Sequence, residues 1–374
     1  MKRKVILSAV LGFFLLAGLG FGLWWFLVGR WHETTDDAYV GGNLVQVTPQ
    51  VAGVVLAIHA DDTEHVQAGQ TLVELDQADA KVGLAQAEAQ LARTVRSVRN
   101  LRASSTGAEA NVAMRRAELA RASQDLERRR AIEKSGAVSG EELQHALDTV
   151  TAAKASLEAA EQQLKAQRAI VERTTVRDHP DVLAAAAKVR EAYLALARTT
   201  LPAPISGVVA RRTVQLGQRI APGATLMAIV SLDSVWVDAN FKENQLADLR
   251  AGQPVELEAD AYGSDVKFHG KVAGFSAGTG AAFALLPAQN ASGNWIKVVQ
   301  RVPVRIALEG KELAEHPLQV GLSMRVDVDT HERGGPRLQA PQRAAASYET
   351  KVFGPLNDAA EKEIEKIIAA NSDG

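Results

Sequence analysis

Two stretches of the chain decide its fold, and they repeat one pattern. The first reads VAGVVLAIHADDTEHVQAGQTLVEL at residues 51–75, and the second reads ISGVVARRTVQLGQRIAPGATLMAI at residues 205–229. They align without a gap at a constant offset of 154 residues, and each carries a pair of glycines at matching positions, Gly53 and Gly69 in the first. A β unit this short buries too little surface to be stable alone. We therefore expect the two stretches to fold together as one domain.

The residues between the two repeats have the pattern of a helical hairpin. No proline occurs between Pro49 and Pro180. Leucine and valine recur every seven residues, first from residue 84 to 126 with Ser105 as the exception and again from 143 to 171, and half of these positions have alanine three residues later. The Gly/Ser-rich residues 135–140 separate the two series and predict the tip of an antiparallel hairpin. A helix over 77–134 would be about 85 Å long. The spacing changes near Pro180, which predicts a break or kink there.

The N-terminal residues have the pattern of a membrane anchor. Residues 5–28 contain no charged side chain and are long enough to cross a bilayer as a helix. Residues 2–4 are basic and precede the span, which predicts a cytoplasmic N-terminus with the rest of the chain outside. A cleaved signal peptide is the alternative, but the apolar run is longer than usual and no clear cleavage site follows it.

Residues 231–330 contain β-strand patterns separated by Gly, Pro and Asn clusters, and they predict a small barrel. The Gly/Ala-rich residues 274–294 read as a long loop. Residues 38–47 precede the first repeat, and we expect them to pair with the late strands. Beyond the barrel the chain has no assigned role, although residues 361–370 are amphipathic.

Together these patterns predict an elongated α+β chain of several domains. The anchor occupies residues 1–30, the two halves of the repeat domain 49–76 and 201–230, and the hairpin 77–200. The remaining ranges are a membrane-proximal strand at 31–48, a β-barrel at 231–317, a second membrane-proximal strand at 318–332, and a C-terminal tail at 333–374.

Composition limits the possible functions. The chain has 374 residues, 47% of them hydrophobic, which is enough for folded domains. A net charge of −2 gives no basic footprint for nucleic acid, and the absence of cysteine excludes a thiol nucleophile and any disulfide. No catalytic or nucleotide-binding motif is present, so we predict no enzymatic activity, cofactor or metal. The acidic residues 60–65 include His65 and could suggest a metal cluster, but a solvated loop explains them better.

The repeat halves resemble those of a lipoyl domain. A split lipoyl-like domain with an inserted hairpin behind an N-terminal anchor resembles the HlyD-like periplasmic adaptor, or membrane fusion protein, family. Within that family the closest motifs are of the EmrA type: TTDDAYVGGN at 34–43, LPAPISGVVARR at 201–212, VWVDANFKENQL at 235–246, LLPAQNASGNWIKVVQRVPVRI at 285–306 and GLSMRVDVDT at 321–330. A lipoyl carrier function is not indicated, because Lys81 lacks the context of a modified lysine.

This resemblance implies the partners and the location. It implies a single-pass protein of the Gram-negative inner membrane with its bulk in the periplasm, acting as a homo-oligomer. The implied function is to link a major-facilitator exporter in the inner membrane to a TolC-like outer-membrane channel, for efflux of drugs or other small amphipathic compounds. The alternative is an adaptor of a type I protein-secretion system or a structural envelope tether.

The same resemblance implies a docking motif at the hairpin tip. Family members that dock a TolC-type channel carry an Arg, a Leu four residues later and a Ser seven further on. Arg128, Ile132 and Ser139 have that spacing, with Ile replacing Leu. The structural alternative is that Arg128 belongs to a solvated run of three arginines, while Ser139 caps the second helix in a capping box with Glu142.

Overall fold

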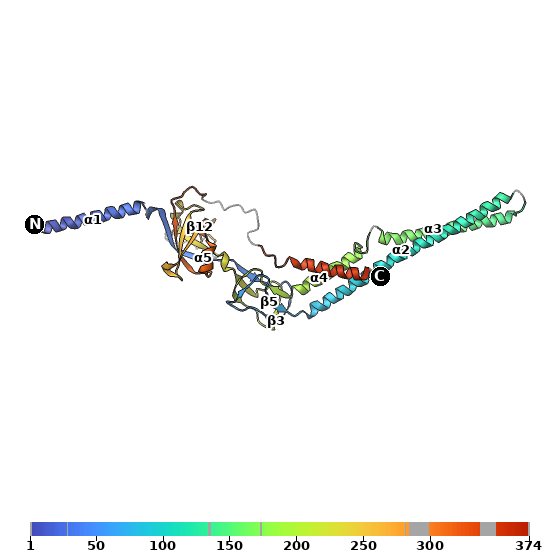
Figure 1. Ribbon diagram of the computed structural model, residues 1–374, viewed down its shortest axis with the longest axis horizontal. Helices are drawn as coiled ribbons and strands as arrows, with labels where there is room; N and C mark the ends of the chain where they lie inside the picture. The colour runs from blue at the N-terminus through green and yellow to red at the C-terminus, as the bar shows by residue number, and fades with distance from the viewer. Residues whose placement is uncertain are drawn as a thin grey trace, which may run out of the picture. The chain divides into compact units, whose positions relative to one another are not determined.

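The computed structural model describes residues 2–27, 29–133, 136–172, 174–280, 282–283, 299–336 and 349–372. The chain divides into two compact units. The first comprises Met1–Pro49, Ala57–Val73 and Leu201–Val352, and the second comprises Gln50–Leu56, Glu74–Thr200 and Phe353–Gly374. The fold class predicted from the sequence is confirmed: an N-terminal apolar helix, a long helical hairpin, a β-barrel and further β structure are all present (Figure 1).

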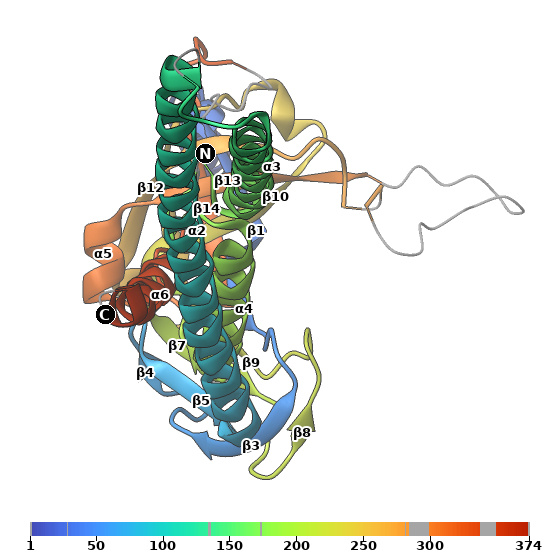
Figure 2. The same cartoon turned by 90° about the vertical axis from the view of Figure 1, so that its right-hand side faces the viewer.

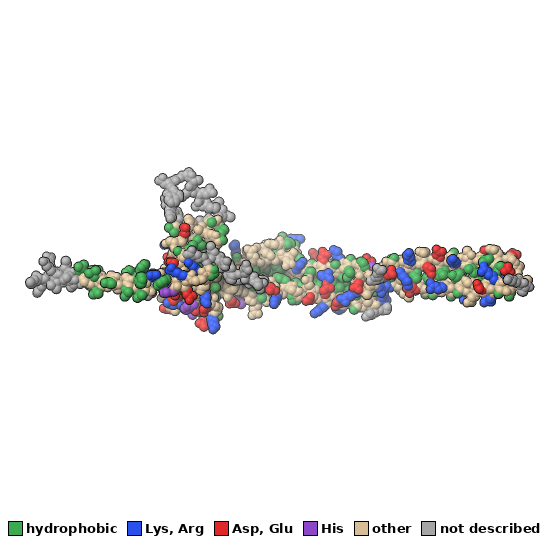
Figure 3. Space-filling model, turned by 90° about the horizontal axis from the view of Figure 1, so that it is seen from above, with side chains coloured by type: hydrophobic (Ala, Val, Ile, Leu, Met, Phe, Trp, Pro, Cys, Tyr) green, Lys and Arg blue, Asp and Glu red, His purple; other side chains and the backbone are tan. Residues whose placement is uncertain are grey.

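The first unit begins with helix α1 (Lys2–Leu27), which is followed by η1 (Gly29–Trp31), a 3-10 helix of one turn. Residues Val10–Trp31 have a mean hydropathy of 2.0, and none of this window is buried against the rest of the chain. Among the residues that the structure describes, this is the one segment long and apolar enough to cross a membrane. Hydrophobic side chains cover its visible surface in Figure 3.

Six strands of the first unit close into a barrel. Their order is β1-β10-β13-β12-β11-β14, and every paired neighbour is antiparallel. Along the strands, buried apolar residues alternate with exposed polar ones, which is why they form a barrel with a filled interior. Their bounds are β1 His32–Gly41, β10 Trp236–Lys242, β11 Pro254–Ala259, β12 Lys267–Phe275, β13 Arg301–Leu308 and β14 Ser323–Asp329. The largest side chains of the core are Phe241, Phe268, Leu257, Ile306, Leu249 and Leu318.

The barrel differs in extent from the sequence-based division. The ranges 31–48 and 318–332 were separated there as membrane-proximal strands, whereas β1 and β14 inside those ranges pair with each other and close the barrel. The reason is burial: Met324, Val326 and Val328 of β14 all point into the barrel core. Without these two strands, β10 and β11 would be open edges.

The described part of the first unit also contains a short helix, the start of a loop and three short 3-10 turns. Helix α5 (Gly310–Glu315) follows β13. The predicted loop at 274–294 lies mostly outside the described residues, and its described start follows the end of β12 at Phe275. Short 3-10 turns are η2 Leu232–Ser234, η3 Gln245–Ala247 and η4 Gly263–Asp265.

Each sequence repeat forms three strands, and the first two strands of the repeats match at the offset of 154 residues, while the third strand of the second repeat begins two residues later than the offset gives. The first repeat gives β3 (Gly53–Ile58), β4 (His65–Val66) and β5 (Thr71–Leu75), and the second gives β7 (Gly207–Arg212), β8 (Arg219–Ile220) and β9 (Met227–Val230). With β2 (Leu44–Val47) and β6 (Thr200–Pro202) they form two sheets, β2-β9-β7-β4 and β6-β5-β3-β8. Each sheet therefore takes two neighbouring strands from one repeat and a third strand from the other.

The repeated glycines have matching structural roles. Gly69 and Gly223 both adopt positive φ, at 87° and 82°, where a side chain would strain the turn. A Cβ atom on Gly207 would lie 2.2 Å from the carbonyl oxygen of Val230, so this strand can approach its neighbour only as glycine. The shared positive φ of Gly69 and Gly223 thus explains why that glycine occurs in both repeats.

The second unit is built on helix α2 (Ala78–Glu133), which runs beside α3 (Gly140–Val171) and then α4 (Pro180–Ala197) (Figure 1). The predicted break falls between α3 and α4, with His179 as the N-cap residue of α4 and Pro180 in its first turn. The heptad seam is buried as the periodicity predicts. The buried seam residues in α2 and α3 are Leu91, Val98, Ser105, Val112, Leu126, Ala146 and Ala160, and Val95 of α2 is buried outside the seam.

Helix α6 (Pro355–Ser372) lies in the range that the sequence left as a tail without a role. It packs against α2 and α4, as Figures 1 and 2 both show. Ile364 is buried in one apolar cluster with residues of those two helices, and Ile367 and Ile368 pack beside it. Across this contact, Glu361 pairs with Arg190 and Glu365 with Arg177. The cluster from α2 and α4 comprises Leu91, Val95, Val98, Val182, Ala185, Ala186 and Val189.

Candidate docking site at the hairpin tip

The turn at the hairpin tip is built by a capping box. The Ser139 Oγ accepts a hydrogen bond from the Glu142 backbone N–H at 3.2 Å, and the Ser139 backbone N–H donates to Glu142 Oε2 at 2.9 Å. Gly136 precedes it with a φ of 74°, which glycine adopts without strain. These bonds satisfy two of the free N–H groups at the start of α3, so this end of the helix is capped. Ser139 therefore caps the second helix of the hairpin, which is the structural role considered for it in the sequence.

Arg128 and Ile132 lie on the last turns of α2, close to the tip in sequence. The Arg128 side chain is 69% exposed, and its Nη2 donates to Asp125 Oδ1 at 3.2 Å. Ile132 is 47% exposed although it is a large apolar residue. The two side chains thus offer a guanidinium with spare donors and an apolar surface to a partner.

Arg129 is a tip residue whose role the docking motif does not include. Its Nε donates to Asp125 Oδ2 at 2.8 Å, and its side chain is less exposed than that of Arg128. It lines a shallow groove between the two helices near the tip. The groove residues are Ala122, Asp125, Arg129, Glu142, His145, Ala146 and Thr149. The available sequence signal was that Arg129, like Arg115, interrupts the d column of the heptad seam.

The groove carboxylates are held in their ionised form. Hydrogen bonds from Arg129 and then Arg128 lower the pKa of Asp125. The backbone N–H and then the hydroxyl of Ser139 lower the pKa of Glu142, with a smaller contribution from the charge of Arg129. The tip therefore presents fixed charges of both signs at neutral pH. This suits recognition of polar groups on a partner.

Residues considered for other chemistry occupy ordinary positions. The acidic stretch after β3 forms a turn in which Asp61 accepts from Arg212 at 2.7 Å, and that bond lowers the pKa of Asp61. No cluster of three or more potential metal ligands occurs in the part of the chain that the structure describes. Lys81 is exposed on the first turns of α2.

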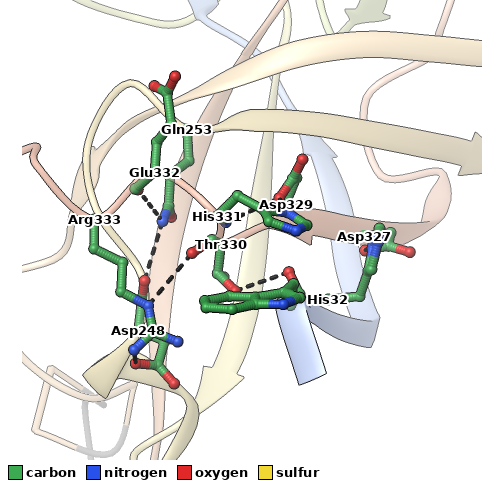
Figure 4. Close-up of polar contacts among 10 residues, drawn as sticks. His32, Asp248, Gln253, Asp327, Asp329, Thr330, His331, Glu332 and Arg333 are labelled. Atoms are coloured by element: carbon green, nitrogen blue, oxygen red, sulfur yellow. Dashed lines mark hydrogen bonds and ion pairs between the residues drawn. The ribbon is translucent and has the colours of Figure 1, made fainter. Parts of the chain in front are cut away.

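A second polar cluster joins the end of the apolar span to the barrel (Figure 4). The Trp31 carbonyl oxygen accepts from both the backbone N–H and the hydroxyl of Thr330, each at 2.8 Å. The ring of Trp31 stacks on His331 with 4.8 Å between ring centroids. The guanidiniums of Arg30 and Arg333 lie 4.4 and 5.1 Å from the same ring. This aromatic and cationic packing fixes Trp31 to the segment after β14.

The segment after β14 is in turn fixed to the barrel. Arg333 pairs with Asp248 at 2.9 Å. The side-chain amide of Gln253 is buried and donates to the carbonyl oxygens of Asp248 and Glu332 at 3.0 and 2.9 Å. Trp31, the last residue of the apolar window, is therefore hydrogen-bonded to Thr330, which directly follows β14, the strand that pairs with β1.

This combination defines a class of chain: one N-terminal apolar helix, a barrel, a split repeat domain and a long hairpin. A family model described as the EmrA alpha-helical hairpin domain matches residues 78–199, and one described as the AaeA-like beta-barrel domain matches residues 234–329. The solved structure of the periplasmic adaptor protein EmrA is 17% identical, covers 80% of this chain and 99% of its own, and has a TM-score of 0.40.

Full-length relatives make the assignment specific. The multidrug export protein EmrA of Escherichia coli K12 is 45% identical over 99% of this chain and 95% of its own length. The fatty acid resistance protein FarA of Neisseria gonorrhoeae is 48% identical over 93% of this chain and 89% of its own length. The chain therefore belongs to the EmrA family of membrane fusion, or periplasmic adaptor, proteins, whose members are non-enzymatic.

Proposed function

We propose that this chain is the adaptor subunit of a tripartite exporter of drugs or other small amphipathic compounds. Helix α1 anchors it in the inner membrane of a Gram-negative cell, and the bulk of the chain lies in the periplasm as a homo-oligomer. Its partners are a major-facilitator exporter in the inner membrane and a TolC-like channel in the outer membrane. The observation that carries this proposal is the hairpin tip, which is rigidly capped and leaves Arg128 and Ile132 exposed.

The tip chemistry explains how docking would work. An arginine whose carboxylate partner uses only part of its guanidinium retains donors for the carbonyls of a partner's helical turn. Ile132 would fill an apolar notch, and burial of its exposed surface on docking would add affinity. Ser139 stabilises the start of α3. Its hydroxyl can bond to the partner only with the hydrogen-bonding capacity that the capping box does not use.

The relatives favour small-molecule export over the other functions considered. The printed names of the two full-length relatives refer to multidrug export and fatty acid resistance. A protein-secretion adaptor or a structural tether would share the layout but would not confer drug resistance. Expression in a strain lacking its own adaptor, together with the cognate transporter, distinguishes these possibilities: restored drug resistance supports export, and restored secretion of a protein substrate supports the alternative.

The topology is tested by fusion. Alkaline phosphatase joined after residue 330 should be active, because the fusion point lies on the periplasmic side of the anchor. A fusion that accumulates to a normal level but is inactive would reverse the proposed orientation.

Docking is tested by substitution at the tip. Arg128→Ala should weaken docking by about 2 kcal/mol or more if its guanidinium bonds to the channel from a desolvated position, whereas loss of a solvated arginine costs tenths. Channel crosslinking and resistance should therefore both be lost in Arg128→Ala and in the triple alanine variant at 128, 132 and 139. Expression and transporter binding should be unchanged, and helicity should change only at the start of α3 in the triple variant, which lacks the Ser139 cap.

Arg130 provides the matched control, because it is exposed and has the same charge. Arg129 is unsuitable as a neutral control, since its removal would also release Asp125. Equal losses from Arg128→Ala and Arg130→Ala would indicate a diffuse charge effect, and undiminished crosslinking in the triple variant would refute the docking motif.

A further inference from the structure

The break between α3 and α4 is closed by one buried histidine. Helix α3 ends at Val171 and α4 begins at Pro180, while α2 continues without interruption beside them. A helix end leaves carbonyl oxygens without intrahelical donors, and a helix start leaves N–H groups without acceptors. His179 serves both ends, and its side chain is only 5% exposed.

The two bonds of His179 require one protonation state. The Nε2 atom lies 3.2 Å from the carbonyl oxygen of Ile170 in the last turn of α3, so it must carry the proton and donate. The Nδ1 atom accepts from the backbone N–H of Asp181 at 3.2 Å, so it must be unprotonated. Pro180 has no N–H, which makes the Asp181 N–H the first donor that α4 needs capped. A neutral imidazole satisfies both helices at once.

We propose that His179 is a proton-sensitive latch on the α3–α4 joint. The imidazolium has two donors and no acceptor, so protonation removes the N-cap of α4. It also places a positive charge at a helix N-terminus, where the helix dipole disfavours it. Histidine is the side chain that ordinarily changes charge between about pH 5 and 8, so mild acidification can open this latch.

The charged groups around His179 determine how its ring moves when it is protonated. The carboxylate of Asp181 lies 3.7 Å from Nδ1, so a protonated ring would turn toward it and leave the backbone N–H uncapped. In the connecting segment, Arg177 is engaged by Glu365 of α6, and Asp178 accepts from the Thr175 hydroxyl.

Helix α2 contributes two arginine side chains that are partly buried. Among the charged residues of α2 near this level, Arg99 donates to the carbonyl oxygen of Asn371 in α6, and the buried Nε of Arg102 has no hydrogen-bond partner among the described residues. Opening would therefore loosen α4 relative to α3 while α2 and α6 stay ordered.

The consequence concerns the hairpin alone and does not depend on which partners it binds. With the latch closed, α3 and α4 keep one bend at the break. With it open, the distal hairpin can take a range of directions, and docking of the tip becomes pH-dependent.

The chain contains no cysteine, so paired spin labels can be introduced without background. Labels on Lys165→Cys in α3 and Ala187→Cys in α4 occupy exposed positions on the two sides of the joint. In the full-length protein in detergent, the distance distribution measured by double electron–electron resonance should broaden between pH 8 and pH 5.5. His179→Asn should abolish that response, because an asparagine amide both accepts and donates but does not titrate here.

His145→Asn is the matched control, since its side chain is 74% exposed on α3. It should respond as the unsubstituted protein does. A distribution that stays the same at both pH values overturns the proposal, and so does a His179→Asn protein that still responds.

Amide exchange gives a second readout that needs no variant, in case His179→Asn does not fold. After normalisation for intrinsic exchange, protection of the first turn of α4 should fall about fivefold at pH 5.5, the factor expected for loss of an N-cap. Unchanged protection there would also overturn the latch.

Discussion

Replacing Ile364 by alanine should detach helix α6 from the hairpin base. Ile364 is 3% exposed, and α6 buries only this side chain and Ala360 completely. Truncating a buried isoleucine to alanine costs 2–5 kcal/mol, so about 3 kcal/mol is expected here. The ion pairs of Glu361 and Glu365 are partly exposed and contribute at most about 1 kcal/mol each. Most of the docking energy of α6 therefore depends on its isoleucines.

A loss of about 3 kcal/mol raises the population of locally detached α6 by roughly 100-fold, if the detached state is reached by local opening. Hydrogen exchange of residues 355–372 measures this directly, and the face of α2 at 91–98 should lose protection together with it. Ile170→Ala is the control, because Ile170 is exposed on α3 and should change stability by less than about 0.5 kcal/mol.

Two results would refute this reasoning. Protection of residues 355–372 that is the same in Ile364→Ala as in the unsubstituted protein would mean that the apolar cluster does not hold α6. Similar losses from Ile364→Ala and Ile170→Ala would mean that the substitution acts on the hairpin generally.

Three further predictions concern other parts of the fold. Gly207→Ala should destabilise the protein by about 3 kcal/mol in thermal unfolding, because the added Cβ meets a carbonyl oxygen of β9, whereas Gly274→Ala meets open space and should cost far less. Ser139→Ala should reduce protection of the first turn of α3 by about 1 kcal/mol, and unaltered exchange there would argue against the capping box. The hydrogen bond that the His269 ring donates to the Glu312 carboxylate raises the pKa of His269 above its ordinary 6.5. Stability from this pair is therefore present below pH 6.5 and is lost as the pH rises through the raised value. Both side chains keep some solvent contact, so the effect is at most tenths of a kcal/mol, and His269→Asn should remove it from a pH series of melting temperatures.

The elements predicted best from the sequence are those with strong periodicity. The heptads predicted a helix over 77–134 and a turn at 135–140, and α2 ends at Glu133 while α3 begins at Gly140. The change of spacing predicted the break at Pro180 because a seven-residue repeat cannot continue through a proline. These features are local, so a single sequence is sufficient to show them.

The features that were missed depend on distant partners. Helix α6 has an amphipathic pattern, but only the three-dimensional structure shows that its apolar face meets Val95 and Val182. The pairing of residues 38–47 with late strands was expected, and β1 does pair with β10 and β14. What the sequence did not show is that β1 and β14 close the barrel itself, because these segments lie almost 300 residues apart. At the tip, the spacing of Arg128 and Ser139 was visible, whereas the engagement of Asp125 by two arginines required the structure.

The hairpin enters and leaves the repeat domain through strands that are hydrogen-bonded to each other. The backbone N–H of Leu75, at the end of β5, donates to the carbonyl oxygen of Thr199 at 2.8 Å, and the Gln77 side chain reaches the hydroxyl of Thr200 at 3.4 Å. Both ends of the insertion are therefore clamped side by side, whatever its length. Adding or removing one heptad from each arm would change the reach of the tip by about 10 Å and leave this base untouched. The length of the hairpin can therefore change independently of the domain from which it projects.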